Sequence, residues 1–175
     1  RKIAVVIATT GFSDEQKALM EDASKQIPVF TSANMSLGVD LLIDLVKKAT
    51  KLLYKNFDIE IIEKHHNQKL DAPSGTALAI ADSINSVLDS QYEYSYDRHT
   101  KREKRKKSEI GIHAVRGGTI VGEHTVIFAG NDEIIEITHK AMSRDIFGVG
   151  ALRAARFVHN KKPGLYHMNN LIENE

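Results

Sequence analysis

The chain has 175 residues, 42% of them hydrophobic, and a formal net charge of +1. This hydrophobic content can form a core, which argues against intrinsic disorder, and the small net charge gives no general attraction to nucleic acid or membranes. No apolar run approaches the roughly 20 residues that cross a bilayer. The chain has no cysteine, which excludes disulfides and thiolate chemistry and is typical of a reducing compartment.

The first part of the chain predicts a strand, a helix and a second strand. Residues 3–8 (IAVVIA) form an unbroken apolar run, typical of a strand buried on both faces. Ser13 followed by Gln16 predicts a capping box that begins a helix, and residues 27–34 (IPVFTSAN) predict the second strand. This order indicates the βαβ beginning of a doubly wound domain. Because the chain starts with Arg1 instead of Met, we interpret it as a fragment or a processed product.

The middle of the chain predicts a second unit of α+β type. Ser36 is a candidate N-cap for a helix whose leucines recur at helical spacing. Residues 57–62 predict a strand, and residues 75–90 predict the next helix. Three further strands, which we expect to be joined as hairpins in a mainly antiparallel or mixed sheet, are predicted over residues 109–118, 119–130 and 132–142.

A last helix is predicted over residues 145–160, ending near Pro163. It contains residues 148–153 (GVGALR), which imitate a dinucleotide fingerprint. The third glycine is missing, however, and no strand precedes the segment, so we expect these glycines to permit close helix packing instead.

The segment after the strand at residues 57–62 gathers groups that can bind and protonate a small anion. Loops that follow strand ends often carry chemistry, and His65 can donate or accept a proton near neutral pH. Lys69 is four residues further on and would share a face with His65 in a helical turn. Residues 73–76 (PSGT) form a turn that opens the next helix, whose backbone N–H groups can bind carboxylate or phosphate. These features predict a small-molecule site for an anionic substrate.

Other interpretations of these residues stay open. Asp71 and Ser74 are as readily turn formers or N-caps as catalytic residues. His65, His66 and Asp71 could ligate a metal, but adjacent histidines point apart and no suitably spaced further ligand follows, so we expect none. Residues 98–107 (RHTKREKRKK) could bind nucleic acid, yet they lack interleaved aromatics. We interpret them as a solvated, mobile loop near an anionic ligand.

Residues 60–84, EIIEKHHNQKLDAPSGTALAIADSI, resemble the signature of the 4-hydroxy-tetrahydrodipicolinate reductase family, also called dihydrodipicolinate reductase. The resemblance covers nearly the whole chain in the family's order. It is supported by the segments ATTGFS, TSANMSLGVDLL, GIHAVRGGTIVGEHTVIFAG, EITHKAMSR and GLYHMNNLI.

The resemblance implies an α/β plus α+β fold: a partial Rossmann-like nucleotide domain and a mixed-sheet substrate domain. Residues 1–35 and 145–175 would form the remnant of the dinucleotide-binding domain, and residues 36–144 the substrate-binding and tetramerisation domain. The implied activity is NAD(P)H-dependent reduction of 4-hydroxy-tetrahydrodipicolinate to tetrahydrodipicolinate, in cytoplasmic lysine and diaminopimelate biosynthesis. The implied assembly is a homotetramer, with no nucleic acid or membrane partner.

The resemblance also implies roles for individual residues. His65 would be the catalytic acid/base and Lys69 the partnering proton donor, so that the nicotinamide gives the hydride and His65 or Lys69 the proton. His66, Gly75 and Thr76 would bind the substrate carboxylate. The cofactor-binding set would be Ala8, Thr9, Thr10, Ser32, Ala33, Asn34 and Met35, with Ala8 at a position where the family has glycine.

The family's glycine-rich phosphate loop, and the residues that choose between NADH and NADPH, would precede Arg1. We therefore expect this polypeptide alone to bind dinucleotide weakly and to turn over slowly or not at all. The alternative is a non-catalytic dicarboxylate-binding domain, against which the retention of both His65 and Lys69 argues, because a binder needs no proton donor.

Overall fold

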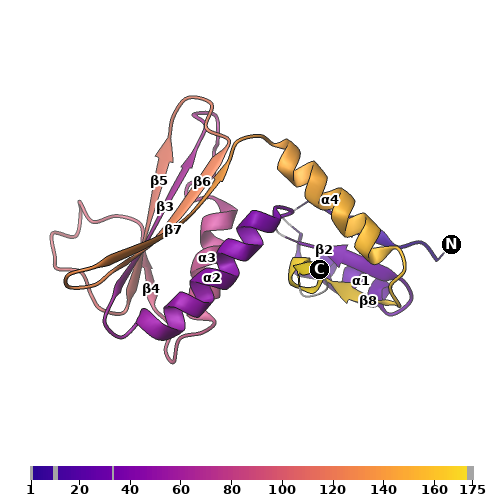
Figure 1. The fold of residues 1–175 in the computed structure, drawn as a ribbon, viewed down its shortest axis with the longest axis horizontal. Helices are drawn as coiled ribbons and strands as arrows, with labels where there is room; N and C mark the ends of the chain where they lie inside the picture. Colours follow the sequence, from indigo (N-terminus) through magenta and orange to yellow (C-terminus); the bar gives the residue numbers. More distant parts are fainter. Residues whose placement is uncertain (1, 10–11, 33, 173–175) are drawn as a thin grey trace. The chain divides into compact units, whose positions relative to one another are not determined.

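The protein is described by a computed structural model that covers residues 2–9, 12–32 and 34–172 (Figure 1). The chain forms two compact units. The first unit contains residues 1–40 and 144–175, and the second contains residues 41–143. The chain therefore leaves the first unit once and returns to it with its last helices.

Among its described residues, the first unit is built on a parallel three-stranded sheet of order β1-β2-β8. Its elements are β1 (Val5–Ile7), α1 (Asp14–Ser24), β2 (Pro28–Thr31), α4 (Asp145–Val158), β8 (Gly164–Tyr166) and α5 (Met168–Ile172). The predicted capping box is confirmed, because Ser13 Oγ accepts from Gln16 N and Gln16 Oε1 accepts from Ser13 N. The core of this unit comprises Phe30, Met35, Ala154, Val158, Met168 and Leu171.

Two expectations for the first unit need correction. The first strand is not buried on both faces: Ile3 is 57% and Val5 40% exposed, because β1 lies at the edge of the sheet that the described residues form. The last helix ends at Val158, five residues before Pro163, so the proline does not end it.

The glycines of α4 differ in their surroundings. A Cβ on Gly150 would lie 1.7 Å from the carbonyl oxygen of Met35, whereas a Cβ on Gly148 would have nothing within 4 Å. The prediction that glycine permits close packing of this helix is therefore confirmed for Gly150 and does not hold for Gly148.

The second unit is a five-stranded mixed sheet of order β4-β5-β3-β6-β7, with α2 and α3 against one face (Figure 1). Its elements are α2 (Leu37–Leu53), β3 (Asp58–His65), α3 (Gly75–Asn85), β4 (Glu93–Ser95), β5 (Glu109–Arg116), β6 (Gly122–Ala129) and β7 (Ile134–Ala141). Strands β4, β5 and β3 are parallel, and β6 and β7 are antiparallel to their neighbours.

The predicted hairpin between residues 109–118 and 119–130 is wrong. Strand β3 lies between β5 and β6, so β5 pairs in parallel with β3 instead of antiparallel with the strand that follows it. The hairpin of β6 and β7 is as expected. This inserted strand brings the C-terminal ends of β3 and β5 side by side, with His65 opposite Arg116.

Strand β3 alternates between buried and half-buried residues along its whole length. Ile59 and Ile61 face the helices and are fully buried. Because side chains of a strand alternate between the two faces of a sheet, Glu63 and His65 continue this inward row. Two titratable side chains thus lie at the end of an otherwise apolar row.

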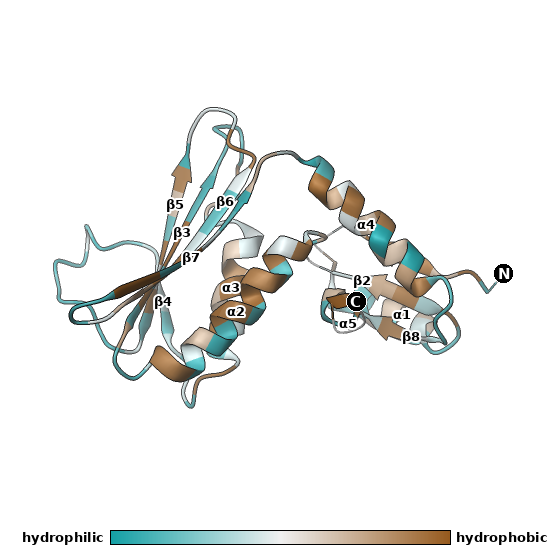
Figure 2. Cartoon of the chain, in the orientation of Figure 1, coloured by the Kyte–Doolittle hydropathy of each residue, from teal (hydrophilic) through white to brown (hydrophobic). Residues whose placement is uncertain are grey.

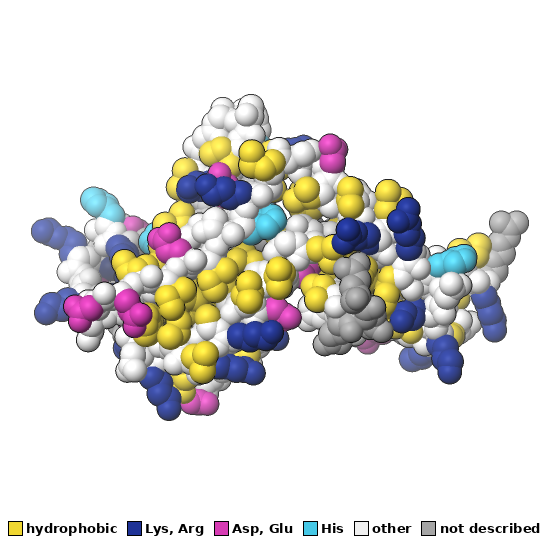
Figure 3. Space-filling view, in the orientation of Figure 1, with side chains coloured by type: hydrophobic (Ala, Val, Ile, Leu, Met, Phe, Trp, Pro, Cys, Tyr) yellow, Lys and Arg dark blue, Asp and Glu magenta, His cyan; other side chains and the backbone are white. Residues whose placement is uncertain are grey.

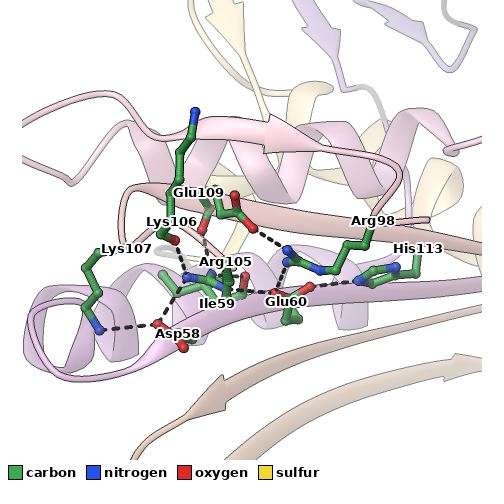
Figure 4. A network of polar contacts seen from close by, with 9 residues as sticks. All are labelled: Asp58, Ile59, Glu60, Arg98, Arg105, Lys106, Lys107, Glu109 and His113. Carbon is green, nitrogen blue, oxygen red and sulfur yellow. Dashed lines mark hydrogen bonds and ion pairs between the residues drawn. The ribbon is translucent and has the colours of Figure 1, made fainter. Parts of the chain in front are cut away.

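The other face of the sheet binds the basic segment 98–107 (Figure 4). Arg98 Nη2 lies 2.6 Å and Arg105 Nε 2.9 Å from Glu60 Oε1, and Arg98 also pairs with Glu109. A Cβ on Gly111 would lie 1.7 Å from Glu60 Oε2, so the glycine lets Glu60 cross strand β5. The interpretation of this segment as a solvated loop near a bound anion is wrong for these two arginines, because they pair with carboxylates of the chain itself.

Some apolar side chains remain at the surface of the second unit. Leu41, Leu45 and Leu52 of α2 are exposed, and hydrophobic side chains gather along this helix (Figures 2 and 3). Strand β7 begins with the exposed Ile134 and Ile135. In the described part of the chain, no helix combines the length and the apolar character needed to cross a membrane.

Candidate functional site

A buried carboxylate, Glu63, lies at the centre of the polar cluster where β3 ends. Its side chain is fully buried, and its oxygens accept hydrogen bonds from Arg116 Nη1 at 2.8 Å and Nη2 at 2.7 Å. The backbone N–H of Ser74 donates to Oε1 at 2.9 Å, and His65 Nδ1 lies 2.6 Å from Oε2. Each carboxylate oxygen is therefore bound by two groups.

Glu63 carries a negative charge despite its burial. Burial alone would raise the pKa of Glu63, but the hydrogen bonds from Arg116, His65 and Ser74 outweigh it and lower the pKa. The hydrogen bonds between Glu63 and Arg116 in turn raise the pKa of Arg116. An ionised carboxylate only accepts hydrogen bonds, so the hydrogen between the two side chains belongs to His65 Nδ1.

Ser74 joins helix α3 to a second buried histidine. Its Oγ caps α3 by accepting from Ala77 N at 3.2 Å, and it lies 3.1 Å from His124 Nε2. The rings of His65 and His124 are in edge contact, with centroids 5.3 Å apart. Burial is the main cause that lowers the pKa of His124 to about 4, and the electrostatic effect of the neighbouring His65 acts in the same direction, so His124 is neutral at neutral pH.

The connection from β3 to α3 holds an ammonium and a carboxylate together. Lys69 Nζ lies 2.8 Å from Asp71 Oδ1. The hydrogen bond from Lys69 is the largest effect on the pKa of Asp71 and lowers it, and the backbone N–H of Gly75 contributes in the same direction. A carboxylate of the chain is therefore stabilised by the ammonium and by the first amide of α3.

The remaining predicted residues of this region occupy the same connection. His66 directly follows β3 and Thr76 lies in the first turn of α3, and both are half-buried. The expected helical turn between His65 and Lys69 is absent: residues 66–70 form a non-helical turn, in which Lys69 N donates to His66 O. In the described ranges, no three histidine, cysteine, aspartate or glutamate side chains gather as a metal site.

Sequence reasoning missed Glu63, Arg116 and His124. The alternation of β3 could have indicated Glu63, because it continues the inward row of Ile59 and Ile61. The alternation of β6 could have indicated His124 in the same way, since Val126 and Phe128 are buried on its row. Arg116 had no such signal, because its place depends on which strand β5 pairs with.

A second candidate site lies within the first unit. A hollow of about 480 Å³ follows the C-terminal ends of β1 and β2 and is lined by Ala8, Asn34, Met35, Phe147, Gly148 and Ala151. Of the other predicted cofactor residues, Thr9 is exposed, Ser32 Oγ donates to Asn34 O at 2.6 Å, and Thr10 and Ala33 lie outside the described residues. Sequence reasoning missed Phe147 and Gly148 of α4.

Two family models match the chain. "Dihydrodipicolinate reductase, N-terminus" matches residues 1–35, and "Dihydrodipicolinate reductase, C-terminus" matches residues 38–172. The chain belongs to the dihydrodipicolinate reductase family. The resemblance seen in residues 60–84 and the predicted α/β plus α+β fold class are thereby confirmed.

Curated relatives and a solved structure agree with this family. The chain is 65% identical to the 4-hydroxy-tetrahydrodipicolinate reductase of Caldanaerobacter subterraneus subsp. tengcongensis, over 99% of the chain and 68% of the relative. It is 55% identical to that of Clostridium botulinum, over 98% and 68%. A dipicolinate-bound dihydrodipicolinate reductase from Paenisporosarcina sp. TG-14 superimposes with a TM-score of 0.75 at 28% identity, over 95% of the chain and 64% of that structure. The chain thus spans about two thirds of the length of these members of the family.

Proposed function

We propose that the protein reduces 4-hydroxy-tetrahydrodipicolinate to tetrahydrodipicolinate with NADH or NADPH, a step of lysine and diaminopimelate biosynthesis. The observation that carries this proposal is the set of groups between β3 and α3. His65, the proton donor, is the last residue of β3, and Lys69, an ammonium, lies in the short connection that follows and leads to the amides at the start of α3. The reductases named above have this activity, and the identity to two of them exceeds half of the aligned residues.

Asp71 indicates how the substrate binds. Its carboxylate pairs with Lys69 Nζ at 2.8 Å, and the backbone of Gly75 helps to lower its pKa; both would favour a substrate carboxylate in the same way. Asp71 is more than half exposed, so it can leave this position at little cost. We infer that a ring carboxylate of the substrate replaces it, with His66 and Thr76 completing the binding set.

His65 supplies the proton of the reaction. Replacement of the 4-hydroxyl group by hydrogen needs one hydride and one proton and releases one water. A bound nicotinamide supplies the hydride. His65 then holds the proton for the electron-rich ring, and Lys69 stabilises the anionic side through charge-assisted hydrogen bonds.

The hollow of the first unit fits the nicotinamide half of the cofactor. Parallel α/β sheets bind nucleotides beyond the C-terminal ends of their strands, which is where Ala8 and Met35 lie. Phe147 offers an aromatic surface, and the open space above Gly148 leaves room for a flat ring. The residues present therefore fit the group.

We further propose that the protein is a cytoplasmic homotetramer assembled through the second unit's sheet. Strand β7 has eight residues and, among the described strands, pairs only with β6, so one edge is open. Its first residues, Ile134 and Ile135, are 64% and 38% exposed. Open edges of this length invite pairing with another chain, and a second copy would cover this one.

Two substitutions test the proposal in the protein that carries this chain. We expect His65→Ala to lower kcat by roughly 10²–10⁴-fold, as for loss of a general acid, while dipicolinate still binds in calorimetry. Lys69→Ala should weaken dipicolinate binding roughly tenfold or more, because it removes a charge-assisted contact. Lys64→Ala is the matched control, since Lys64 pairs with Glu123 on the other face of the sheet. Unchanged turnover in both site variants would refute the assignment.

The alternative is a dicarboxylate-binding domain without catalysis. The Lys69–Asp71 pair favours this alternative, because Lys69 binds a carboxylate there without help from a histidine. Dipicolinate binding without reduction by either cofactor, in the wild-type protein that carries this chain, would decide for this alternative.

A further inference from the structure

We infer that Glu63 is a positioning residue: it keeps a hydrogen on Nδ1 of His65, so that Nε2 is the nitrogen that takes up the second proton and then gives it to the substrate. This transfer leaves the ring in the tautomer with hydrogen on Nδ1. The inference rests on the proposed role of His65 as proton donor. It gives a role to the Glu63 carboxylate, which is fully buried and therefore cannot contact a substrate.

Glu63 cannot turn away from His65. Arg116 binds both of its oxygens, and the N–H of Ser74 holds Oε1 from the side of α3. Arg116 is itself fixed, because its Nη2 also donates to Asp71 O at 2.5 Å. The carboxylate therefore presents Oε2 to Nδ1 in a single orientation, at 2.6 Å.

The geometry around Nε2 complements this arrangement. A Cβ on Gly122 would lie 3.1 Å from His65 Nε2, tighter than an ordinary van der Waals contact. The backbone there is not in a conformation that requires glycine. We infer that Gly122 keeps the surroundings of Nε2 clear, while Glu63 holds the opposite side of the ring.

The neighbouring His124 and Lys69 are less suited than His65 to give a proton to the substrate. His124 contacts the His65 ring, but its Nε2 is bonded to Ser74 Oγ. Lys69 pairs with Asp71 in the free protein and, in the proposed function, with the substrate carboxylate that replaces it. His65 therefore differs from His124: its Nδ1 is held by the carboxylate of Glu63, and its Nε2 lies beside Gly122.

A Glu63→Gln variant keeps the shape of the side chain but removes its negative charge and one of its two acceptor oxygens. The carboxylate accepts four hydrogen bonds, and an amide has one oxygen and one nitrogen that only donates. With its oxygen kept for Ser74 and Arg116, the amide nitrogen would face His65 and favour hydrogen on Nε2 instead. The same change of a histidine-orienting carboxylate to an amide in serine proteases gives the wrong tautomer and lowers kcat about 10⁴-fold.

The first experiment needs no variant. Nitrogen NMR of the wild-type protein with labelled histidine, at a pH where His65 is neutral, should show hydrogen on Nδ1 and none on Nε2. Assignment of the signal comes from its loss in His65→Ala. Hydrogen on Nε2 would overturn the inference, whether or not the protein is a reductase.

The second experiment is kinetic. Glu63→Gln should lower kcat at least roughly 100-fold, leave dipicolinate affinity within about threefold, and shift the His65 signal to the other tautomer. Glu60→Gln is the matched control, because Glu60 lies on the same strand and binds His113 and two arginines on the opposite face; its kcat should stay within about threefold. Wild-type-like kcat and tautomer in Glu63→Gln would overturn the inference.

Gly122→Ala tests the other nitrogen if Glu63→Gln does not fold. We expect kcat to fall at least roughly tenfold while the His65 signal still shows hydrogen on Nδ1. Full activity in Gly122→Ala would show that the space beside Nε2 is not used. Absence of reduction in the wild-type protein that carries this chain would refute the proposed function, and the NMR result would still decide the Glu63–His65 relation.

Discussion

His124 links the stability of the second unit to pH. It is 4% exposed, and burial, aided by the electrostatic effect of the neighbouring His65, lowers its pKa to about 4. An unfolded chain protonates this histidine near pH 6.5, so the unfolded state binds more protons as the pH falls from 6.5 to 4. The stability contributed by neutral His124 is present above pH 6.5 and is lost over that interval.

We expect this histidine to account for a loss of about 2 kcal/mol in unfolding free energy between pH 7 and pH 5. His124→Asn should remove most of that pH dependence, whatever its effect on stability at pH 7. Urea unfolding at both pH values measures it, and His99→Asn, in an exposed loop, should keep the wild-type dependence. An equal dependence in His124→Asn and wild type would show that His124 titrates normally.

Residue type alone predicted part of the candidate site. His65 and Lys69 could be selected because few side chains supply a proton or a fixed positive charge, and both follow a predicted strand. Glu63 could not be assigned a role, because its partner Arg116 lies 53 residues further along the chain. Their contact depends on the parallel pairing of β3 with β5, which the predicted hairpin had excluded.

At the scale of elements, the two glycines of α4 give opposite predictions for the same substitution. Gly148→Ala should raise stability by about 0.5–1 kcal/mol, because alanine favours the helix and the added Cβ meets nothing. Gly150→Ala should lower stability by about 1–3 kcal/mol or more, because the Cβ would lie 1.7 Å from a backbone oxygen that cannot easily move.

Thermal and urea unfolding of both variants measures this difference. Equal effects of the two substitutions would contradict the packing of α4 against Met35. Gly148 also lines the proposed nicotinamide hollow, so Gly148→Ala should weaken cofactor binding while it stabilises the fold. A stabilised variant with unchanged cofactor affinity would place the nicotinamide elsewhere.

The elements with strong apolar, periodic or capping signals were predictable, β1 and β2 among them, whereas β4 and β8 were not. α1 and α2 had candidate N-caps in Ser13 and Ser36, and both helices form there. Strands β4 and β8 have three residues each, too few for an alternating pattern to be recognised. The order of strands also escaped prediction, because β5 follows a long polar segment that gives no sign of which strand lies beside it.

At the scale of the whole molecule, the sheet of the second unit uses its two faces differently. One face carries the helices and the Glu63 cluster, and the other carries the ion pairs around Glu60. The charge of segment 98–107 is therefore partly balanced within the chain. This arrangement leaves β7, with its exposed isoleucines, as the open edge of the described sheet.

Ile134→Asp tests whether that edge carries the proposed assembly. In a symmetric interface the substitution is present in every copy. Each interface would therefore bury an unpaired carboxylate, which is strongly unfavourable. We expect light scattering to give a tetramer for the wild type and a smaller species for Ile134→Asp, whereas Leu52→Asp, on exposed α2, should keep the wild-type mass. Dipicolinate affinity should stay within about threefold in both, because the Glu63 cluster and Lys69 are not on β7. An unchanged mass for Ile134→Asp would exclude this end of β7 from the interface.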